Sequence, residues 1–300
     1  MKTPLIALVA SMALVSAAQA DSKFYGKMNV TAGYNDSAEA FGVESNASRV
    51  GIKGSEELAS SKLIYQAEYE TDIDGDGTVL KQRDSYIGLA YSGVGTIKMG
   101  IMDTPLKKSQ GKYDLFNDIV DIKTVLDGEN RIANSVNYTT AMSGPFQASL
   151  SFMMAEGVAG KGSDGISASV TYKEGDIYAA VAVDDSVPGK QTSNLRATVI
   201  YSLGDMRIGG ILNNVDTSDT GAGGDELAVG ANVSLKMGMN TVKAQFESGD
   251  QVAVGATSLS LGVDRKLAKS TKAFAYLNQF DTDAANSDVL VLALGLEHKF

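Results

Sequence analysis

Cysteine and tryptophan are both absent from this chain, and histidine occurs once, as His298. Without cysteine, the chain has no disulfide framework, no thiol nucleophile and no thiolate metal ligand. A single histidine gives little support to a Ser-His-Asp triad or to a histidine-rich metal site. We therefore expect no catalytic residue, no bound metal and no cofactor.

Long apolar runs are also missing beyond the start of the chain, so no later segment has the ~18 consecutive apolar residues of a membrane-spanning helix. The start itself reads as an export signal. Lys2 precedes an apolar stretch from Leu5 to Val15, and Ala18-Gln19-Ala20 fits the small-residue cleavage pattern. We expect a signal peptide over residues 1–20 and one mature domain over residues 21–300. Such a chain is either soluble or a membrane protein built from strands.

The charge balance is acidic, with 36 Asp and Glu against 26 Lys and Arg. This argues against nucleic-acid binding, which requires a basic surface. Proline is rare, with 4 residues, whereas glycine is abundant, with 32. Many glycines and few prolines suit tight turns between strands. The mean hydropathy of −0.04 fits both a soluble protein and a barrel with a wet interior, so composition alone does not decide between them.

The carboxy-terminal residues 289–300 show the clearest pattern in the chain. Every second residue is apolar from Leu290 to Leu296, and this register ends on the terminal Phe300. The intervening register, which runs from Val291 to Lys299, is smaller and more polar. A period of two predicts a strand with one apolar side. In a closed barrel, this side of the last strand faces lipid, and the strand itself pairs with the first.

Similar alternation recurs along the mature chain and predicts sixteen strands. The segments are 23–35, 48–56, 62–72, 82–92, 95–103, 131–140, 146–156, 164–173, 176–184, 193–203, 205–214, 225–236, 239–248, 254–265, 271–281 and 288–300. Sixteen apolar faces need either a very large core or a bilayer, and a mature chain of this length fits the bilayer better. We therefore predict an all-β fold, a 16-stranded antiparallel transmembrane β-barrel.

The connections between these strands fall into two classes. Short turns such as 93–95, 174–175 and 204–205 alternate with longer acidic stretches at 36–46, 72–77, 184–192, 216–225 and 281–288. One connection, 104–130, is much longer and contains apolar residues such as Phe116 and Leu126 that a free loop would not expose. Loops of this length inside compact folds are usually functional. We expect this segment to pack against the barrel wall.

Several stretches of the chain resemble the Gram-negative general porins. The matching segments are Phe24-Tyr25-Gly26-Lys27, the run from Ser48 to Leu58, Gln82 to Leu89, Gly95 to Gly100, Arg131 to Tyr138 and the terminal Phe300. The resemblance implies a trimeric barrel in the outer membrane whose third external loop folds inward and narrows the bore. Residues 104–130 take the place of this constriction loop. The resemblance also implies that Phe300 is the signal for outer-membrane assembly.

The candidate pore-lining residues combine strand register with this resemblance. Lys27, Arg49 and Arg83 fall on the inward register of their strands, Arg131 opens a strand on its polar register, and together they resemble the family's basic wall cluster. Gln66 and Glu68 share the polar face of one strand. Asp114, Asp118, Asp121, Asp127 and Glu129 lie in the inward loop. Opposed charges across a narrow wet gap produce a transverse field. The acidic total favours cations.

The leading functional hypothesis is a channel for passive diffusion of small hydrophilic solutes and ions across the outer membrane. The expected partners are outer-membrane lipid, the barrel assembly machinery, the diffusing solutes and further copies of the chain in a homotrimer. Two alternatives stay open: a barrel that anchors surface loops as an adhesin, and a barrel hydrolase. The segment 72–77 begins like an EF-hand calcium loop, but its twelfth position is Arg83 instead of glutamate.

Overall fold

A computed structural model describes residues 21–75, 77, 79–155, 164–187, 192–218 and 224–300. Within these residues, seventeen strand segments form one antiparallel sheet that closes on itself. The two short helical turns both lie in the long connection after the sixth segment. The signal peptide predicted for residues 1–20 lies outside the described residues.

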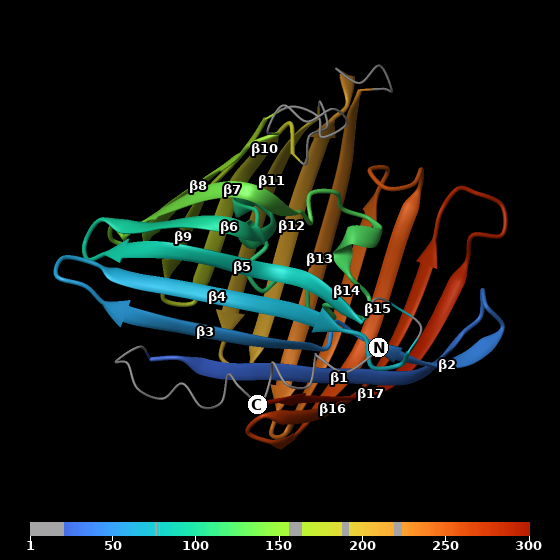
Figure 1. Cartoon of the computed structure of the whole chain (residues 1–300). Helices are drawn as coiled ribbons and strands as arrows, with labels where there is room; N and C mark the ends of the chain where they lie inside the picture. Colours follow the sequence, from blue (N-terminus) through green and yellow to red (C-terminus); the bar gives the residue numbers. More distant parts are fainter. Residues whose placement is uncertain (1–20, 76, 78, 156–163, 188–191, 219–223) are drawn as a thin grey trace, which may run out of the picture.

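The strands follow one another around the wall in chain order (Figure 1). Their bounds are β1 Lys23–Asn35, β2 Ala40–Ser45, β3 Arg49–Glu57, β4 Lys62–Thr71, β5 Leu80–Tyr91, β6 Gly95–Asp103, β7 Arg131–Thr140, β8 Phe146–Met153, β9 Gly165–Glu174, β10 Ile177–Asp185, β11 Ser193–Leu203, β12 Met206–Asp216, β13 Asp225–Met237, β14 Asn240–Gly249, β15 Ala256–Ala268, β16 Thr271–Asp281 and β17 Val289–Lys299. We call the end that carries both termini and the short turns the inner end, and the opposite end the outer end.

β2 and β3 together form one interrupted wall strand. β2 pairs with the outer half of β1, from Val30 to Asn35, whereas β3 pairs with its inner half, from Lys23 to Lys27. The seventeen segments therefore occupy sixteen wall positions (17 − 1), which confirms the predicted 16-stranded barrel. The prediction of a loop over residues 36–46 was wrong in part. Backbone pairing with β1 makes most of this acidic stretch a strand, which its composition does not indicate.

The wall closes where the last strand meets the first. β17 pairs with β1 from Lys299 opposite Lys27 to Val291 opposite Asn35. The closed ladder leaves neither strand with an unpaired edge, and an unpaired edge would not be stable in a bilayer. The predicted pairing of the first and last strands is thus confirmed.

The side chains alternate between the two faces of the wall, as the sequence predicts. On β15, Leu259 and Leu261 point outward and are 45 % and 44 % exposed, whereas Ser258 and Ser260 point inward and are at most 1 % exposed. The outside of the barrel is therefore apolar and the inside polar, the reverse of a soluble globular protein. None of the helices formed by the described residues has the length and apolar character needed to cross a membrane.

Candidate functional site

The connection from Thr104 to Asn130 lies inside the barrel. Figure 1 shows it, in green, between the wall of β3–β6 in front and the wall of β11–β15 behind. It begins with helix α2, Pro105–Ser109, whose first turn is capped by the Thr104 hydroxyl accepting from the Lys107 N–H at 3.0 Å. A threonine followed by proline is a common helix start, because proline needs no N–H partner in the first turn.

The apolar side chains of this constriction loop pack on the wall, which confirms the prediction of an inward-folded loop. Val125 and Leu126 are fully buried in a cluster with Ile200 and Ile211 of β11 and β12. A second cluster joins the middle of the loop to β16. Its buried members are Phe116, Val120, Phe274 and Tyr276. Burial of these side chains removes apolar surface from the wet bore and fixes the loop in place.

Polar wall residues grip the loop by its backbone. The Lys243 ammonium donates to the Leu115 carbonyl at 2.7 Å, and the Gln245 side-chain oxygen accepts from the Leu115 N–H at 2.7 Å. Asn232 donates to the carbonyl of Tyr113 at 2.5 Å. These residues lie on the inward register of β13 and β14. Sequence reasoning missed them, although a lysine among small polar residues on an inward register was an available signal.

A buried arginine holds the other end of the loop. Arg196 of β11 is fully buried, and its guanidinium donates to Glu129 Oε1 at 2.5 Å, to the Asp127 carbonyl at 2.7 Å and to Asn213 Oδ1 at 3.0 Å. Gln110 of the loop donates to the second oxygen of Glu129 at 3.0 Å. Glu129 and Asp127, which the sequence predicts to line the pore, therefore both take part in holding the loop on the wall. Sequence reasoning also missed Arg196.

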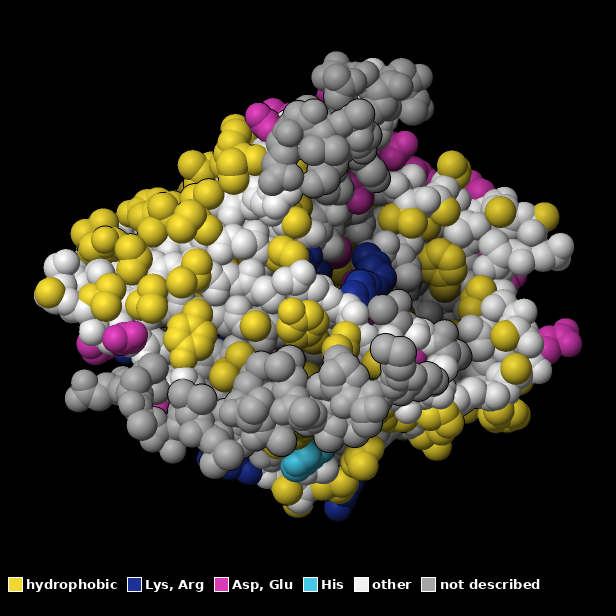
Figure 2. All heavy atoms as spheres, in the orientation of Figure 1, with side chains coloured by type: hydrophobic (Ala, Val, Ile, Leu, Met, Phe, Trp, Pro, Cys, Tyr) yellow, Lys and Arg dark blue, Asp and Glu magenta, His cyan; other side chains and the backbone are white. Residues whose placement is uncertain are grey.

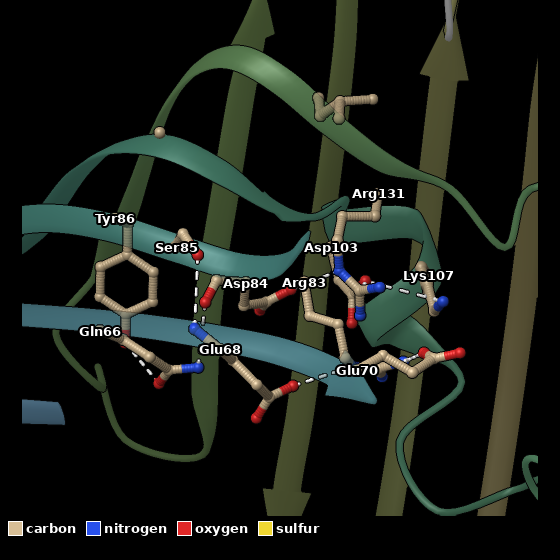
Figure 3. Close-up of polar contacts among 12 residues, drawn as sticks. Gln66, Glu68, Glu70, Arg83, Asp84, Ser85, Tyr86, Asp103, Lys107 and Arg131 are labelled. Atoms are coloured by element: carbon tan, nitrogen blue, oxygen red, sulfur yellow. Dashed lines mark hydrogen bonds and ion pairs between the residues drawn. The ribbon is translucent and has the colours of Figure 1, made fainter. Parts of the chain in front are cut away.

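On the opposite wall, the structure brings together four of the predicted residues. Arg83 donates to Glu68 at 2.9 Å and to Glu70 at 2.5 Å, and Arg49 lies 3.9 Å from Glu68. Gln66 follows on the same face of β4 (Figure 3). Two arginines and two glutamates form a cluster whose charges cancel. The sequence missed only Glu70, which continues the register of Gln66 and Glu68.

A β-bulge in β5 determines which partners the neighbouring charged side chains contact. The pairing of β4 with β5 shifts by one residue between Ala67 and Tyr69, at the position of Arg83 and Asp84. Arg83 then bonds the β4 glutamates, while Asp84 accepts from Arg131 of β7 at 2.6 Å. A bulge re-aims side chains in this way because it adds one residue to a single strand.

Arg131 connects the wall to the constriction loop. Beyond Asp84, it bonds Asp103 at 2.9 Å, and Lys107 of α2 lies 3.6 Å from the same carboxylate (Figure 3). Lys107 in turn lies 4.0 Å from Glu129. The predicted residues Arg131 and Glu129 thus belong to one chain of alternating charges.

Lys27 and Asp118 form an ion pair between β1 and the tip of the loop. Both side chains are largely buried, so the pair is screened less than a surface pair. The two residues were predicted independently, one on the wall and one on the loop. Their contact fixes the position of the loop along β1.

The remaining loop acids serve the loop's own conformation. Asp121 accepts from the Lys123 N–H and caps the helical turn η1, Ile122–Thr124. Asp114 accepts from the backbone N–H groups of Phe116 and Asn117 at 3.0 and 2.9 Å. Burial raises the pKa of Asp114 to about 6, although these hydrogen bonds oppose the shift. Burial also raises the pKa of Glu129, against the charges of Arg196 and Lys107.

We expect ion selectivity to change between pH 7.5 and pH 5. Because burial raises the pKa of Asp114 to about 6, the protonated form of this side chain stabilises the folded loop. This stabilisation is complete below the usual pKa of aspartate and is lost as the pH rises through 6. On acidification the bore loses one negative charge, so the permeability of cations relative to anions falls. Reversal potentials measured at both pH values check this. Asp114→Asn removes most of the change, and an equally strong pH response in that variant would exclude Asp114 as its source.

The terminal Phe300 occupies a defined seat on the barrel seam. Its N–H donates to the Gly26 carbonyl at 3.1 Å and its carbonyl accepts from the Gly26 N–H at 3.0 Å. The ring lies over Gly26, where an added Cβ would come within 2.3 Å of the ring, and its centroid is 6.0 Å from that of Phe24. Only glycine leaves room for this ring.

Within the described ranges, no group of three or more His, Asp or Glu side chains is placed to hold a metal ion. In the segment that begins like an EF-hand loop, residues 76 and 78 lie outside the described residues.

A sequence model of the Gram-negative porin family matches residues 5–285. The chain belongs to this family. It therefore forms a multi-pass β-barrel channel for passive diffusion across the outer membrane of a Gram-negative cell. The search of curated proteins returns no match.

Solved porin structures share the fold of this porin. The anion-selective porin from Comamonas acidovorans superposes with a TM-score of 0.79 at 21 % identity, covering 94 % of this chain and all of that one. OmpF of Salmonella typhi in complex with daunomycin gives 0.77 at 12 %, covering 93 % and 97 %. The trimer form of OmpT, an outer membrane protein of Vibrio cholerae, gives 0.72 at 16 %, covering 94 % and 100 %.

Proposed function

We propose that small hydrophilic solutes and ions cross this porin through a gap between the constriction loop and the charged wall of β3–β7, without covalent chemistry. The observation that carries the proposal is the double anchoring of the loop inside the bore, by Arg196 at one end and by Lys243 in the middle. A loop held on one wall leaves a passage along the other. Charges fixed on both sides then orient dipolar solutes and separate the paths of cations and anions.

The proposed lining of this gap is the set derived from the sequence, extended by its ion-pair partners. On the wall we place Lys27, Arg49, Arg83, Arg131, Gln66 and Glu68, together with Glu70, Asp84 and Asp103. On the loop we place Asp114, Asp118, Asp121, Asp127 and Glu129. The single histidine, His298, lies on the outward register near the inner rim and bonds Thr271 at 2.8 Å, which supports a role without catalysis.

Conductance in planar lipid bilayers tests the channel directly. Purified, folded protein is expected to insert and to give discrete current steps in potassium chloride. Protein that is folded by heat-modifiable mobility on electrophoresis and yet gives no steps would contradict the proposal.

Neutralising Arg49 and Arg83 together should shift selectivity towards cations. The double variant Arg49→Gln/Arg83→Gln leaves Glu68 and Glu70 without their counter-charges. Two unopposed carboxylates in the bore attract cations and repel anions. Reversal potentials in asymmetric potassium chloride measure the shift. The variant that also carries Glu68→Gln and Glu70→Gln restores the balance and is the matched control.

We further propose that the porin assembles as a homotrimer, surrounded by outer-membrane lipid and inserted by the barrel assembly machinery. Support comes from the relative from Vibrio cholerae, whose structure is described as a trimer form, and from the apolar outer surface of the wall. Mild electrophoresis should show a band near three times the monomer mass that collapses on heating. A species that stays monomeric at every detergent concentration would contradict the trimer.

A further inference from the structure

Most basic side chains inside this porin lie beside a carboxylate, although Lys243 and Lys272 share the single carboxylate of Asp264. An ion pair within 4.0 Å holds each of Lys27, Arg49, Arg83, Lys107, Arg131, Arg196, Lys243 and Lys272. A charge beside its counter-charge acts as a dipole, and its field fades quickly in salt water. The long-range field of the bore is therefore set by charges that lack such partners.

Lys53 and Lys98 differ from these paired residues. Both lie on inward registers. Lys53 of β3 is opposite Gln66 of β4, and Lys98 of β6 lies between Gly88 of β5 and Asn137 of β7. Among the described residues, neither forms an ion pair. Each ammonium sits instead over a tyrosine ring: Lys53 lies 4.8 Å from the centre of Tyr25, and Lys98 lies 4.4 Å from that of Tyr86.

A ring stabilises an ammonium without cancelling its charge. The face of an aromatic ring attracts a cation by about 0.5–2 kcal/mol, yet the ring itself is neutral. The tyrosines are fixed in turn, because Tyr25 donates to Glu68 at 2.9 Å and Tyr86 to Gln66 at 3.4 Å. The two lysines are thus held against the wall, and no ion pair among the described residues cancels either charge.

Further lysines continue this line towards both ends. Lys23 lies directly opposite Lys53 in the β1–β3 ladder, at the inner mouth. Like charges directly opposite one another destabilise a sheet, so the fold accepts a cost at this position. At the other end, Lys108 of α2 in the constriction loop is exposed. Figure 2 shows Lys and Arg side chains gathered inside the central hollow, and Asp and Glu mainly towards its rim.

We propose that the wall of β1–β6 carries an anion route, in which Lys53 and Lys98 draw small carboxylates and phosphates from the inner mouth towards Lys108 at the constriction. The inference rests on the proposed channel function and names a solute class for it. Lysine suits a route better than a tight site, because an ammonium binds anions as a point charge without the bidentate geometry of arginine.

Acidic groups without an ion pair lie on the other side of the loop. Glu247 of β14 is buried and accepts from the Tyr113 hydroxyl at 3.3 Å, and Asp114 is fixed by the Gln245 amide at 3.3 Å. These carboxylates do not attract anions, so the anion path that the unpaired lysines offer lies along the β1–β6 wall. The proposed route favours anions, whereas the acidic total of the whole chain favours cations, because net charge does not report which charges face the passage.

The test compares two double variants of the full-length porin that lose the same charge. Lys53→Gln/Lys98→Gln removes the two ammonium groups of the proposed route. Lys173→Gln/Lys236→Gln removes two exposed lysines from the inner ends of β9 and β13, on another part of the wall. Reversal potentials are measured at low salt, ~10 mM, where the Debye length is about 30 Å, and again at 1 M, where it is about 3 Å.

The route predicts that the chloride-to-potassium permeability ratio falls by roughly threefold or more in the first variant only, and that 1 M salt largely removes the difference. An unchanged ratio, or an equal fall in both variants, overturns the route. If the double variant fails to fold, Lys53→Gln alone, at an exposed position, decides the matter by the same comparison. Absence of any channel steps in the unmodified protein would instead contradict the proposed function.

Discussion

Replacing Arg196 by alanine will release the carboxyl half of the constriction loop and raise the single-channel conductance. The side chain is fully buried and bonds Glu129, the Asp127 carbonyl and Asn213. Its removal leaves the Glu129 carboxylate, only 6 % exposed, without its main counter-charge. Breaking a buried pair on one side costs about 3–5 kcal/mol. Arg196 anchors the carboxyl half of the loop, so a cost of this size shifts this half towards detached conformations that widen the passage.

The expected signature is a larger mean conductance with added current noise, recorded in planar bilayers at fixed salt. Arg207→Ala is the matched control, because it removes the same charge from β12, the next strand, and Arg207 has no hydrogen bond to the constriction loop among the described residues. Equal conductance in the two variants would show that Arg196 does not hold the loop. Normal heat-modifiable mobility of both variants shows that the barrel itself has formed.

Deleting Phe300 will greatly reduce the amount of folded porin in the outer membrane. The deletion removes two backbone hydrogen bonds to Gly26 and the contacts of the ring at the seam where β17 meets β1. Each net hydrogen bond contributes about 0.5–1.5 kcal/mol. The ring is 47 % exposed, so it adds the contacts with Gly26 and Phe24 but not the free energy of a fully buried side chain. These losses fall on the ladder between β17 and β1 that closes the barrel, so they hinder closure. The fraction of heat-modifiable protein in outer-membrane preparations measures the effect.

Two substitutions separate seam closure from recognition of the carboxy-terminus. Phe300→Tyr keeps the ring and is expected to assemble normally. Gly26→Val leaves the carboxy-terminal residues untouched but places a side chain within the space of the Phe300 ring. It should therefore impair closure after normal targeting to the membrane. Normal assembly of Gly26→Val would show that the glycine seat is dispensable.

The barrel was predictable because most wall strands obey one local rule. Alternation of apolar and polar residues fixes which side of each strand faces outward, and this information lies within about ten residues. The β1–β2 hairpin was missed because its strand Ala40–Ser45 has an acidic and glycine-containing sequence, and its state is decided by pairing with β1. The bulge at Arg83 and Asp84 was equally invisible, since it depends on the register between two strands.

The site was predictable in outline only. Register placed Arg49, Arg83 and Glu68 on one face, and the structure joins them in one cluster. The anchors Arg196 and Lys243 were missed because their partners are backbone carbonyls of a loop 69 and 128 residues away. A contact of this kind leaves no pattern in the sequence of the loop, because any residue supplies a carbonyl.

These main-chain contacts leave the loop open to change. Lys243, Gln245 and Asn232 hold Leu115 and Tyr113 through amide and carbonyl groups that every amino acid shares. Exposed side chains at other loop positions are therefore free to vary while the scaffold keeps its shape. The porin therefore has an exchangeable filter. Substitutions at exposed loop positions, natural or engineered, change which solutes pass without changing the contacts that hold the loop in place.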